Sequence, residues 1–202
     1  MRDSAVQPRK KPVQRRARAT IAVIVEAGAQ VLTQQGISGF TTNHIAERAG
    51  VSVGTIYQYF PNKEAILVAL QLTEMRQTLG LIALQLNDTR ASPKERMRNA
   101  IRAFLDSEQA ELDLRRALAQ VRVSLPKDGE VVDIGSQAVE MLHAFLVANG
   151  LIDRGNRFAS ECIVTTITSV GERANIHSDA DVERWTEALV RMINVHLDPD
   201  RP

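Results

Sequence analysis

The sequence of 202 residues predicts an all-α protein. Hydrophobic residues make up 44% of the chain and aromatic residues only 4%, so Leu, Ile, Val and Ala must build the core. Ala, Leu, Glu, Arg and Gln dominate, which favours helices, and long alternating runs of β-branched residues are absent. The length suits one large domain or two small ones.

The first helix is predicted over residues 15–35. Its apolar and small residues recur at i, i+3, i+4, i+7, i+10 and i+11, which gives one stripe for packing. These residues are Ile21, Ile24, Val25, Gly28, Val31 and Leu32. Gly36 is expected to end the helix, and Ile37 and Phe40 are expected to cover the small core.

Two short helices follow, over residues 42–50 and 53–60, with a tight turn between them. Thr42 is expected to cap the first of them, because its hydroxyl can accept from a free backbone N–H. Gly50 should end that helix in a left-handed conformation, and Ser52 should cap the next one. This pattern predicts a helix-turn-helix, which places its second helix in the major groove of DNA.

The second short helix has an uncharged polar surface opposite its inward-facing residues Ile56 and Phe60. A glycine there lets the backbone approach DNA, and hydroxyl groups can donate to phosphates. Gln58 can pair with adenine, and Lys63, just after the Asn62 cap of the next helix, offers a cation to a phosphate. The predicted DNA-binding residues are Thr42, Ser52, Val53, Gly54, Thr55, Tyr57, Gln58, Tyr59 and Lys63.

Many residue types of this segment occur together in one known family. They are Ile45-Ala46, Ala49-Gly50-Val51-Ser52, Gly54-Thr55-Ile56-Tyr57, Tyr59-Phe60 and Lys63. In these positions the chain resembles the tetracycline-repressor (TetR) family of bacterial transcriptional regulators, over residues 20–69. The resemblance implies a homodimer and a pocket for a small effector whose binding releases DNA. The alternative is a generic three-helix packing unit with exposed tyrosines.

The charge is concentrated at the N-terminus. Residues 1–20 contain seven basic residues and one acidic residue, a net charge of +6, whereas the whole chain carries +1 and the remainder therefore −5. Residues 1–14 hold two prolines and little apolar content, which predicts a disordered basic arm. Two interpretations stay open: a solvated tail, or an arm that follows DNA phosphates or enters the minor groove.

Six more helices are predicted after the helix-turn-helix. Ser92-Pro93-Lys94-Glu95 is a capping box with proline at the first helical position, and Asn149-Gly150 is a helix stop. The predicted ranges are 62–86, 92–107, 109–125, 130–148, 153–175 and 179–197. The chain is thus expected to hold a three-helix helix-turn-helix DNA-binding domain at 15–69, after the arm, and a six-helix effector-binding and dimerisation domain at 70–202.

Apolar side chains of the middle helices are candidates for the effector pocket, which would then suit a lipophilic molecule. The candidates are Met97, Phe104, Leu118, Met141, His143 and Phe145. The same residues also suit ordinary core packing, and His143 alone also suits a surface or hydrogen-bonded position.

The last two helices carry apolar surfaces broader than one packed face requires. In the last helix two apolar stripes lie about a quarter turn apart, which predicts contacts on two sides and a four-helix bundle across a two-fold axis. The predicted dimer residues are Phe158, Ile163, Ile167, Val170, Trp185, Leu189, Met192 and His196. A core within one chain is the alternative.

The sequence argues against several other classes of protein. Its four histidines are scattered and Cys162 is the one cysteine, so no metal-ligand spacing, cofactor or enzyme is expected. No apolar run is long enough for a membrane span and no secretory signal is visible, so a cytoplasmic protein is expected. The interpretation is a DNA-binding regulator, most simply a repressor at a near-palindromic operator. Control by a protein partner or assembly instead of a small ligand is the alternative.

Overall fold

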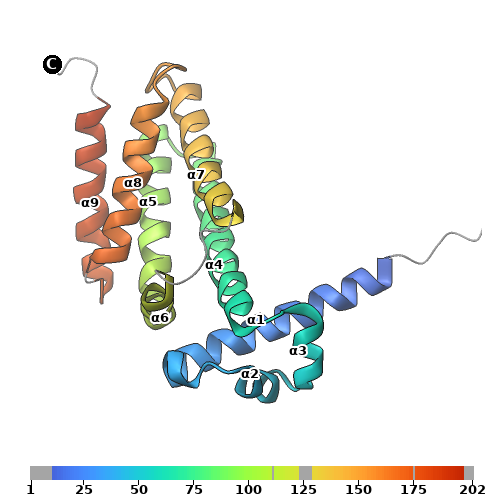
Figure 1. Ribbon diagram of the computed structural model, residues 1–202. Helices are drawn as coiled ribbons and strands as arrows, with labels where there is room; N and C mark the ends of the chain where they lie inside the picture. Colours follow the sequence, from blue (N-terminus) through green and yellow to red (C-terminus); the bar gives the residue numbers. More distant parts are fainter. Residues whose placement is uncertain (1–10, 111, 123–128, 175, 198–202) are drawn as a thin grey trace, which may run out of the picture. The chain divides into compact units, whose positions relative to one another are not determined.

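The structure, a computed structural model, describes residues 11–110, 112–122, 129–174 and 176–197. Within these ranges the chain forms nine α-helices and no strand (Figure 1). They are α1 (Lys11–Gly39), α2 (Thr42–Ala49), α3 (Val53–Tyr59), α4 (Lys63–Leu86), α5 (Pro93–Ala110), α6 (Leu112–Arg122), α7 (Gly129–Ala148), α8 (Arg157–Arg173) and α9 (Asp179–His196). The predicted all-α fold with an N-terminal helix-turn-helix is confirmed.

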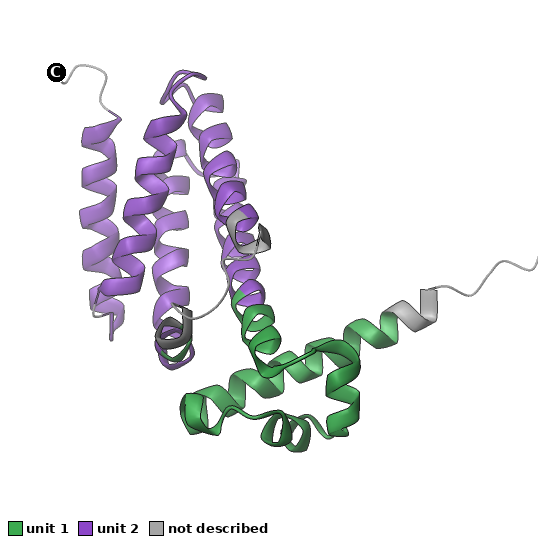
Figure 2. Cartoon of the chain, viewed as in Figure 1, with its two compact units in different colours: residues 1–71, 117–125 green, residues 72–116, 126–202 purple. Residues whose placement is uncertain are grey.

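The chain divides into two compact units (Figure 2). Unit 1 comprises Met1–Gln71 and Ala117–Leu125, and unit 2 comprises Leu72–Arg116 and Pro126–Pro202. The boundary falls inside α4 and again inside α6, so each of these helices contributes residues to both units. The boundary inside α4, after Gln71, lies two residues beyond residue 69, where the sequence analysis ended the DNA-binding domain.

Unit 1 is built on α1, which packs against α2, while α2 packs against α3. The α1 helix contains one break at Gly36, whose φ of 64° and ψ of −171° are open to glycine but not to residues with a side chain. Phe40 is fully buried as predicted, whereas Ile37 is 38% exposed and does not cover the core. Gly28 brings α1 close to α4, because a Cβ built there would lie 3.1 Å from Ile66 Cγ2.

The helix-forming pattern at the N-terminus extends further than the sequence indicated. Helix α1 begins at Lys11 rather than at residue 15. Residues 15–19 are Arg and Ala, which are strong helix formers, and Pro12 is tolerated because it lies in the first turn of the helix. Residues 11–14 of the predicted arm are therefore helical. Residues 1–10 lie outside the described residues.

Unit 2 has one apolar core to which α4, α5, α7, α8 and α9 all contribute. Its buried residues are Leu86, Met97, Ala100, Ile101, Phe104, Leu105, Leu142, Phe145, Leu146, Ile163, Ile176, Val182, Leu189 and Ile193. Helix α5 packs along both α8 and α9. At Gly171 the approach of α8 to α5 is so close that an added Cβ would lie 2.5 Å from Phe104 Cε1.

Side-chain caps fix several helix ends in unit 2. The predicted capping box is confirmed: Glu95 N donates to Ser92 Oγ at 3.3 Å, and Ser92 N donates to Glu95 Oε2 at 2.9 Å. Helix α8 begins at Arg157, later than predicted, because Asn156 caps it by accepting from Ala159 N at 3.2 Å. Gly150 has the left-handed φ of 66° expected of a helix stop.

Arg96 joins three helices of unit 2. From α5, its Nε donates to the backbone oxygen of Leu86 at the end of α4, at 2.6 Å. Its guanidinium also lies 4.9 Å from the ring centroid of Phe145 on α7, in cation–π contact. The carbonyl at the α4 terminus, which has no partner within the helix, is thereby satisfied.

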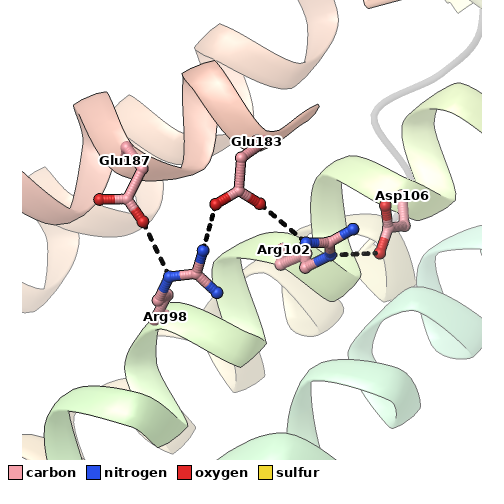
Figure 3. A network of polar contacts seen from close by, with 5 residues as sticks. All are labelled: Arg98, Arg102, Asp106, Glu183 and Glu187. Atoms are coloured by element: carbon pink, nitrogen blue, oxygen red, sulfur yellow. Dashed lines mark hydrogen bonds and ion pairs between the residues drawn. The ribbon is translucent and has the colours of Figure 1, made fainter. Parts of the chain in front are cut away.

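An ion-pair network runs along the junction of α5 and α9 (Figure 3). Glu183 accepts from both Arg98 and Arg102, and its Oε2 atom lies 2.8 Å from Arg102 Nη1. Glu187 pairs with Arg98 at 2.8 Å, and Asp106 lies 3.6 Å from Arg102. The hydrogen bond that Arg98 donates to Glu187 raises the pKa of Arg98 above its ordinary value. These side chains are partly exposed, so each pair stabilises only weakly, but together they fix the register of the two helices.

Candidate DNA-binding site

A glycine and a serine define the turn between α2 and α3. Gly50 ends α2 with a φ of 66° and a ψ of 31°, and its N–H is bonded to carbonyl groups of the preceding turn. Ser52 Oγ accepts from Thr55 N at 3.0 Å, which caps α3 as predicted. The hydroxyl of Thr55 lies 2.8 Å from Ser52 Oγ, so this group also belongs to the cap. The angle between the two helices is therefore held by local bonds.

The start of α2 differs by one residue from the prediction. Thr41 is the cap, with extended backbone angles of −126° and 152°, and its hydroxyl accepts from His44 N at 3.2 Å. Thr42 is already the first helical residue and is half-buried, so its predicted role as the cap is wrong. Two adjacent threonines leave this choice open in the sequence, because either hydroxyl suits a cap.

The inner side of α3 anchors the helix. Ile56 is fully buried and Phe60 is 7% exposed, as predicted, and Ile45 on α2 is also fully buried. A seven-residue helix is too short to be stable alone, so these apolar contacts must hold it in place.

The outer side of α3 is open. Tyr57 is 55% exposed, Gln58 and Gly54 are exposed, and Val53 and Tyr59 are half-buried. A Cβ built on Gly54 would meet only Ser52 Oγ, at 3.6 Å, so the backbone there is unobstructed. The exposed amide of Gln58 can both donate and accept, which matches the edge that adenine presents in the major groove.

Asn62 and Lys63 lie at the start of α4. Asn62 Oδ1 accepts from Ala65 N at 2.9 Å, which confirms the predicted cap. Lys63 is the first residue of α4 and is half-buried. The structure therefore brings Lys63 into the same unit as the outer side of α3.

A polar contact between α1 and α2 was not predicted. Arg48 on α2 donates to the side-chain amide of Gln34 on α1. His44 Nδ1 lies 2.8 Å from the backbone oxygen of Gly39, at the end of α1. The first pair joins side chains of two helices, and the second joins a ring nitrogen to a backbone oxygen five residues earlier.

Comparison with known proteins shows that the segment containing the helix-turn-helix matches a known family. Residues 24–70, which include all of α2 and α3, match the family described as bacterial regulatory proteins, tetR family. Over this N-terminal part the chain matches the TetR family of transcriptional regulators. This is a family of regulators and not of enzymes.

Several TetR-type regulators are similar to the N-terminal part of this chain. The regulator BetI of Paraburkholderia xenovorans is 28% identical over 88 residues, which cover 44% of this chain and 45% of the relative. The fatty acid metabolism regulator protein of Bacillus subtilis is 35% identical over 74 residues, covering 37% of this chain and 38% of the relative. The chain thus matches less than half of the length of these relatives.

Solved structures of the TetR family share the fold across both units. A regulator from Mesorhizobium loti has a TM-score of 0.70 at 20% identity and covers 89% of this chain and 97% of its own. FadR from Bacillus halodurans has a TM-score of 0.66 at 20% identity, and the match covers 96% of this chain and 99% of FadR. FadR from B. subtilis, described in complex with stearoyl-CoA, has a TM-score of 0.58 at 21% identity, covering 85% and 96%.

Most of the predicted effector residues are packed into the interior. Met97, Phe104 and Phe145 are 8%, 7% and 6% exposed in the unit 2 core, and Met141 packs against that core. Leu118 is also buried but falls in unit 1. These apolar side chains are therefore packed in the interior, as the alternative interpretation of ordinary core packing expected.

His143 is half-buried and bound on both ring nitrogens. Its Nδ1 atom lies 3.2 Å from Ser160 Oγ and its Nε2 atom lies 3.1 Å from the backbone oxygen of Arg154. These contacts join α7 to the start of α8. His143 therefore occupies a hydrogen-bonded position, which was the alternative to a place in the effector pocket.

The predicted dimer residues fall into two groups. Ile163 and Leu189 are 3% and 2% exposed in the core of their own chain, so they offer no surface to a partner, and this part of the prediction is wrong. Ile167, Val170 and Trp185 are half-buried at the edge of that core. The exposed group is Phe158, Met192 and His196, with exposed fractions of 72% for Phe158 and 45% for Met192.

Val195 on α9 is a further exposed apolar side chain. Separately, a shallow apolar hollow of about 460 Å³ lies between α8 and α9. The hollow is lined by Thr165, Thr166, Ser169, Val170, Arg173, Ala174 and Trp185. A second hollow, of about 470 Å³, lies at the end of α4 and includes Gly80, Leu84 and Arg90. Neither hollow contains a predicted effector residue.

Within the part of the chain that the structure describes, no group of three or more His, Cys, Asp or Glu side chains could hold a metal ion. No helix in that part is long and apolar enough to cross a membrane. The free Cys162 is half-buried on α8.

Proposed function

We propose that this chain is a repressor that binds a near-palindromic operator as a homodimer and leaves it when a small lipophilic effector binds. One observation carries the DNA-binding part. Helix α3 is fixed by the buried Ile56 and Phe60, while its opposite side exposes Gly54, Tyr57 and Gln58 to solvent. A short, anchored helix with an uncharged polar surface suits the major groove.

The outer residues of this site divide into two roles. Tyr59 and Lys63 are suited to phosphates, which fix the position of the protein but carry no sequence information. Gln58 is suited to a base edge, since its amide can pair with adenine through two hydrogen bonds. Val53 at the start of α3 can contact a thymine methyl group.

The homodimer is supported by exposed apolar side chains on α8 and α9. Phe158, Met192 and Val195 remain exposed in one chain, on the same two helices as the hollow lined by Val170 and Trp185. A two-fold dimer through this surface buries them and pairs two copies of α3 for one operator. The two copies must then lie about 34–36 Å apart to read successive major grooves.

The lipophilic effector is supported by the apolar core of unit 2 and by the relatives. FadR of B. subtilis has been described with stearoyl-CoA, and the fatty acid metabolism regulator of the same organism shares 35% identity over the N-terminal part. An acyl chain could be accommodated by displacing side chains such as Met97, Met141 and Phe145. The coupling between the effector and DNA is then of the usual order, about 1–3 kcal/mol.

A second candidate is a DNA-binding regulator that a protein partner or assembly controls. The close packing of Met97, Phe104 and Phe145 favours it, because these side chains are almost wholly buried in the unit 2 core and an effector would have to displace them. Both candidates bind DNA through the same site, and they differ only in what releases the protein from the DNA.

The decisive experiment is footprinting and binding of the full chain on the DNA upstream of its own gene and on a library of genomic fragments. A palindromic footprint bound by a dimer, with affinity that falls steeply with salt, supports the repressor. No footprint on any fragment contradicts it. Stearoyl-CoA is then titrated into the complex, with coenzyme A as the control. Release by stearoyl-CoA alone supports the lipophilic effector, and unchanged binding with both favours the partner-controlled regulator.

A further inference from the structure

The first turns of α1 form a basic helical extension, defined here as residues 11–23. No side chain described between Arg15 and Val23 is buried, and Ile24 is the first fully buried residue of the helix. In Figure 1 these turns project beyond the other helices of unit 1. The extension therefore belongs to α1 by its backbone, while its described side chains, residues 15–23, are not among the buried core residues.

The charge of the extension is uniformly positive. Arg15, Arg16 and Arg18 are exposed, and no ion pair joins them to another residue that the structure describes. The sequence contains no acidic residue from position 11 until Glu26, whose carboxylate accepts from Gln30 at 3.0 Å. Like charges held on one helix repel each other, so an anionic partner would stabilise this surface.

The helical conformation holds these charges in a fixed direction. An isolated helix of this length is marginal in water, but here the folded part of α1 supplies the nucleus from which it continues. Arg15 and Arg18, three residues apart, lie on the same side of the helix. A flexible tail would instead distribute the charges over many positions.

We propose that the basic helical extension binds the phosphate backbone of DNA flanking the half-site that α3 reads. The proposal rests on the DNA-binding function proposed above and is carried by charge complementarity and by geometry within unit 1. Arg15 precedes Ile24 by nine residues, or about 14 Å at 1.5 Å per residue. Since a DNA strand rises about 3.4 Å per nucleotide, this length is comparable to the rise of about four nucleotides, so the extension is long enough to contact more than one phosphate.

The test compares two duplexes. One holds only the footprinted palindrome, and the other adds ten base pairs on each side. The full chain is expected to bind the longer duplex at least tenfold more tightly at low salt. Its salt dependence should also be steeper, by about 0.9 in log K against log salt for each additional phosphate contact.

The variant R15Q/R16Q/R18Q removes the three arginines, and K94Q/R116Q/R154Q is the matched control. The control removes the same number of charges at exposed sites in unit 2. The first variant is expected to bind both duplexes alike, with a shallower salt slope, while the control keeps the preference for the longer duplex. Circular dichroism checks that both variants stay folded.

A third variant, Ala17→Pro, keeps every arginine but interrupts the helix, because proline removes a backbone donor and clashes with the preceding turn. Its preference for the longer duplex should fall at least threefold. Wild-type behaviour of this variant would overturn the helical part of the proposal.

If R15Q/R16Q/R18Q keeps the wild-type salt slope and the wild-type preference for the longer duplex, the extension does not contact DNA. The proposed regulator function would still stand. If the wild-type chain itself binds no fragment specifically, both proposals fall together. The two failures are thus distinguishable in one series of measurements.

Discussion

Arg115 Nη1 on α6 donates to Glu108 Oε1 on α5 at 2.6 Å, with 21% and 10% of the two side chains exposed. Arg115 Nη2 also donates to Thr78 Oγ1 on α4 at 2.9 Å. The pair therefore joins three helices within unit 2. Arg115 Nε is buried without a hydrogen-bond partner among the described residues, so the pair is the main compensation for that desolvated guanidinium.

Removing one member of this pair should destabilise unit 2 strongly. Glu108→Ala leaves the Arg115 charge buried without its anion, which costs about 3 kcal/mol in the free energy of unfolding. Urea unfolding followed by circular dichroism measures the loss. The double variant E108M/R115M should recover most of it, because it removes both charges. Equal losses in the single and the double variant would show that packing, and not charge, dominates.

Gly171→Ala should destabilise the contact of α8 with α5. The new methyl group would lie 2.5–2.6 Å from Cε1 and Cζ of Phe104, whose ring is held in the core and must shift. Overpacking of this kind costs about 1–3 kcal/mol. Gly80→Ala is the control, since its Cβ meets nothing within 4 Å and the helix gains up to about 1 kcal/mol. Thermal melting should therefore shift the two variants in opposite directions.

Substitutions on α3 should separate base reading from phosphate binding. Tyr59→Ala and Lys63→Ala should weaken binding to every DNA sequence alike, because phosphates carry no base information. Gln58→Ala should cost about 1–3 kcal/mol on the operator and relax the preference at one base pair. Fluorescence anisotropy on the operator and its single-base variants measures both effects. An equal loss for Gln58→Ala on all duplexes would remove it from the reading role.

The capping box should make α5 sensitive to acid. The hydrogen bond from the Ser92 hydroxyl, followed by that from its backbone N–H, lowers the pKa of Glu95 below its ordinary value of 4.5. A depressed pKa in the folded state gives stability that is present above pH 4.5 and is lost as the pH falls through the folded value. Urea midpoints between pH 7 and pH 3 should fall more for the wild type than for Glu95→Gln. Parallel curves would contradict this linkage.

The helix-turn-helix was predictable because its signals are local. Gly50, Ser52 and Asn62 each act on a backbone within three or four residues, and Ile56 and Phe60 are buried as their spacing indicated. The single error there, Thr42 in place of Thr41, is a shift of one residue between two identical side chains.

The second unit was less predictable because its contacts join distant segments. Periodicity placed Ile163 and Leu189 on apolar faces, but it does not reveal whether a face packs within its own chain or remains open like Phe158. The close approach at Gly171 and the pairing of Arg115 with Glu108 depend on tertiary geometry, which leaves no local signal.

The half-buried Cys162 on α8 makes the chain suitable for spectroscopy without prior mutagenesis. Because the chain contains one cysteine, a thiol-reactive spin label attaches at a single position in each protomer. Two labelled protomers in a dimer then give one interspin distance, whereas a monomer gives none. The same label, read with and without DNA, would report whether the protomers change their spacing when the operator is released.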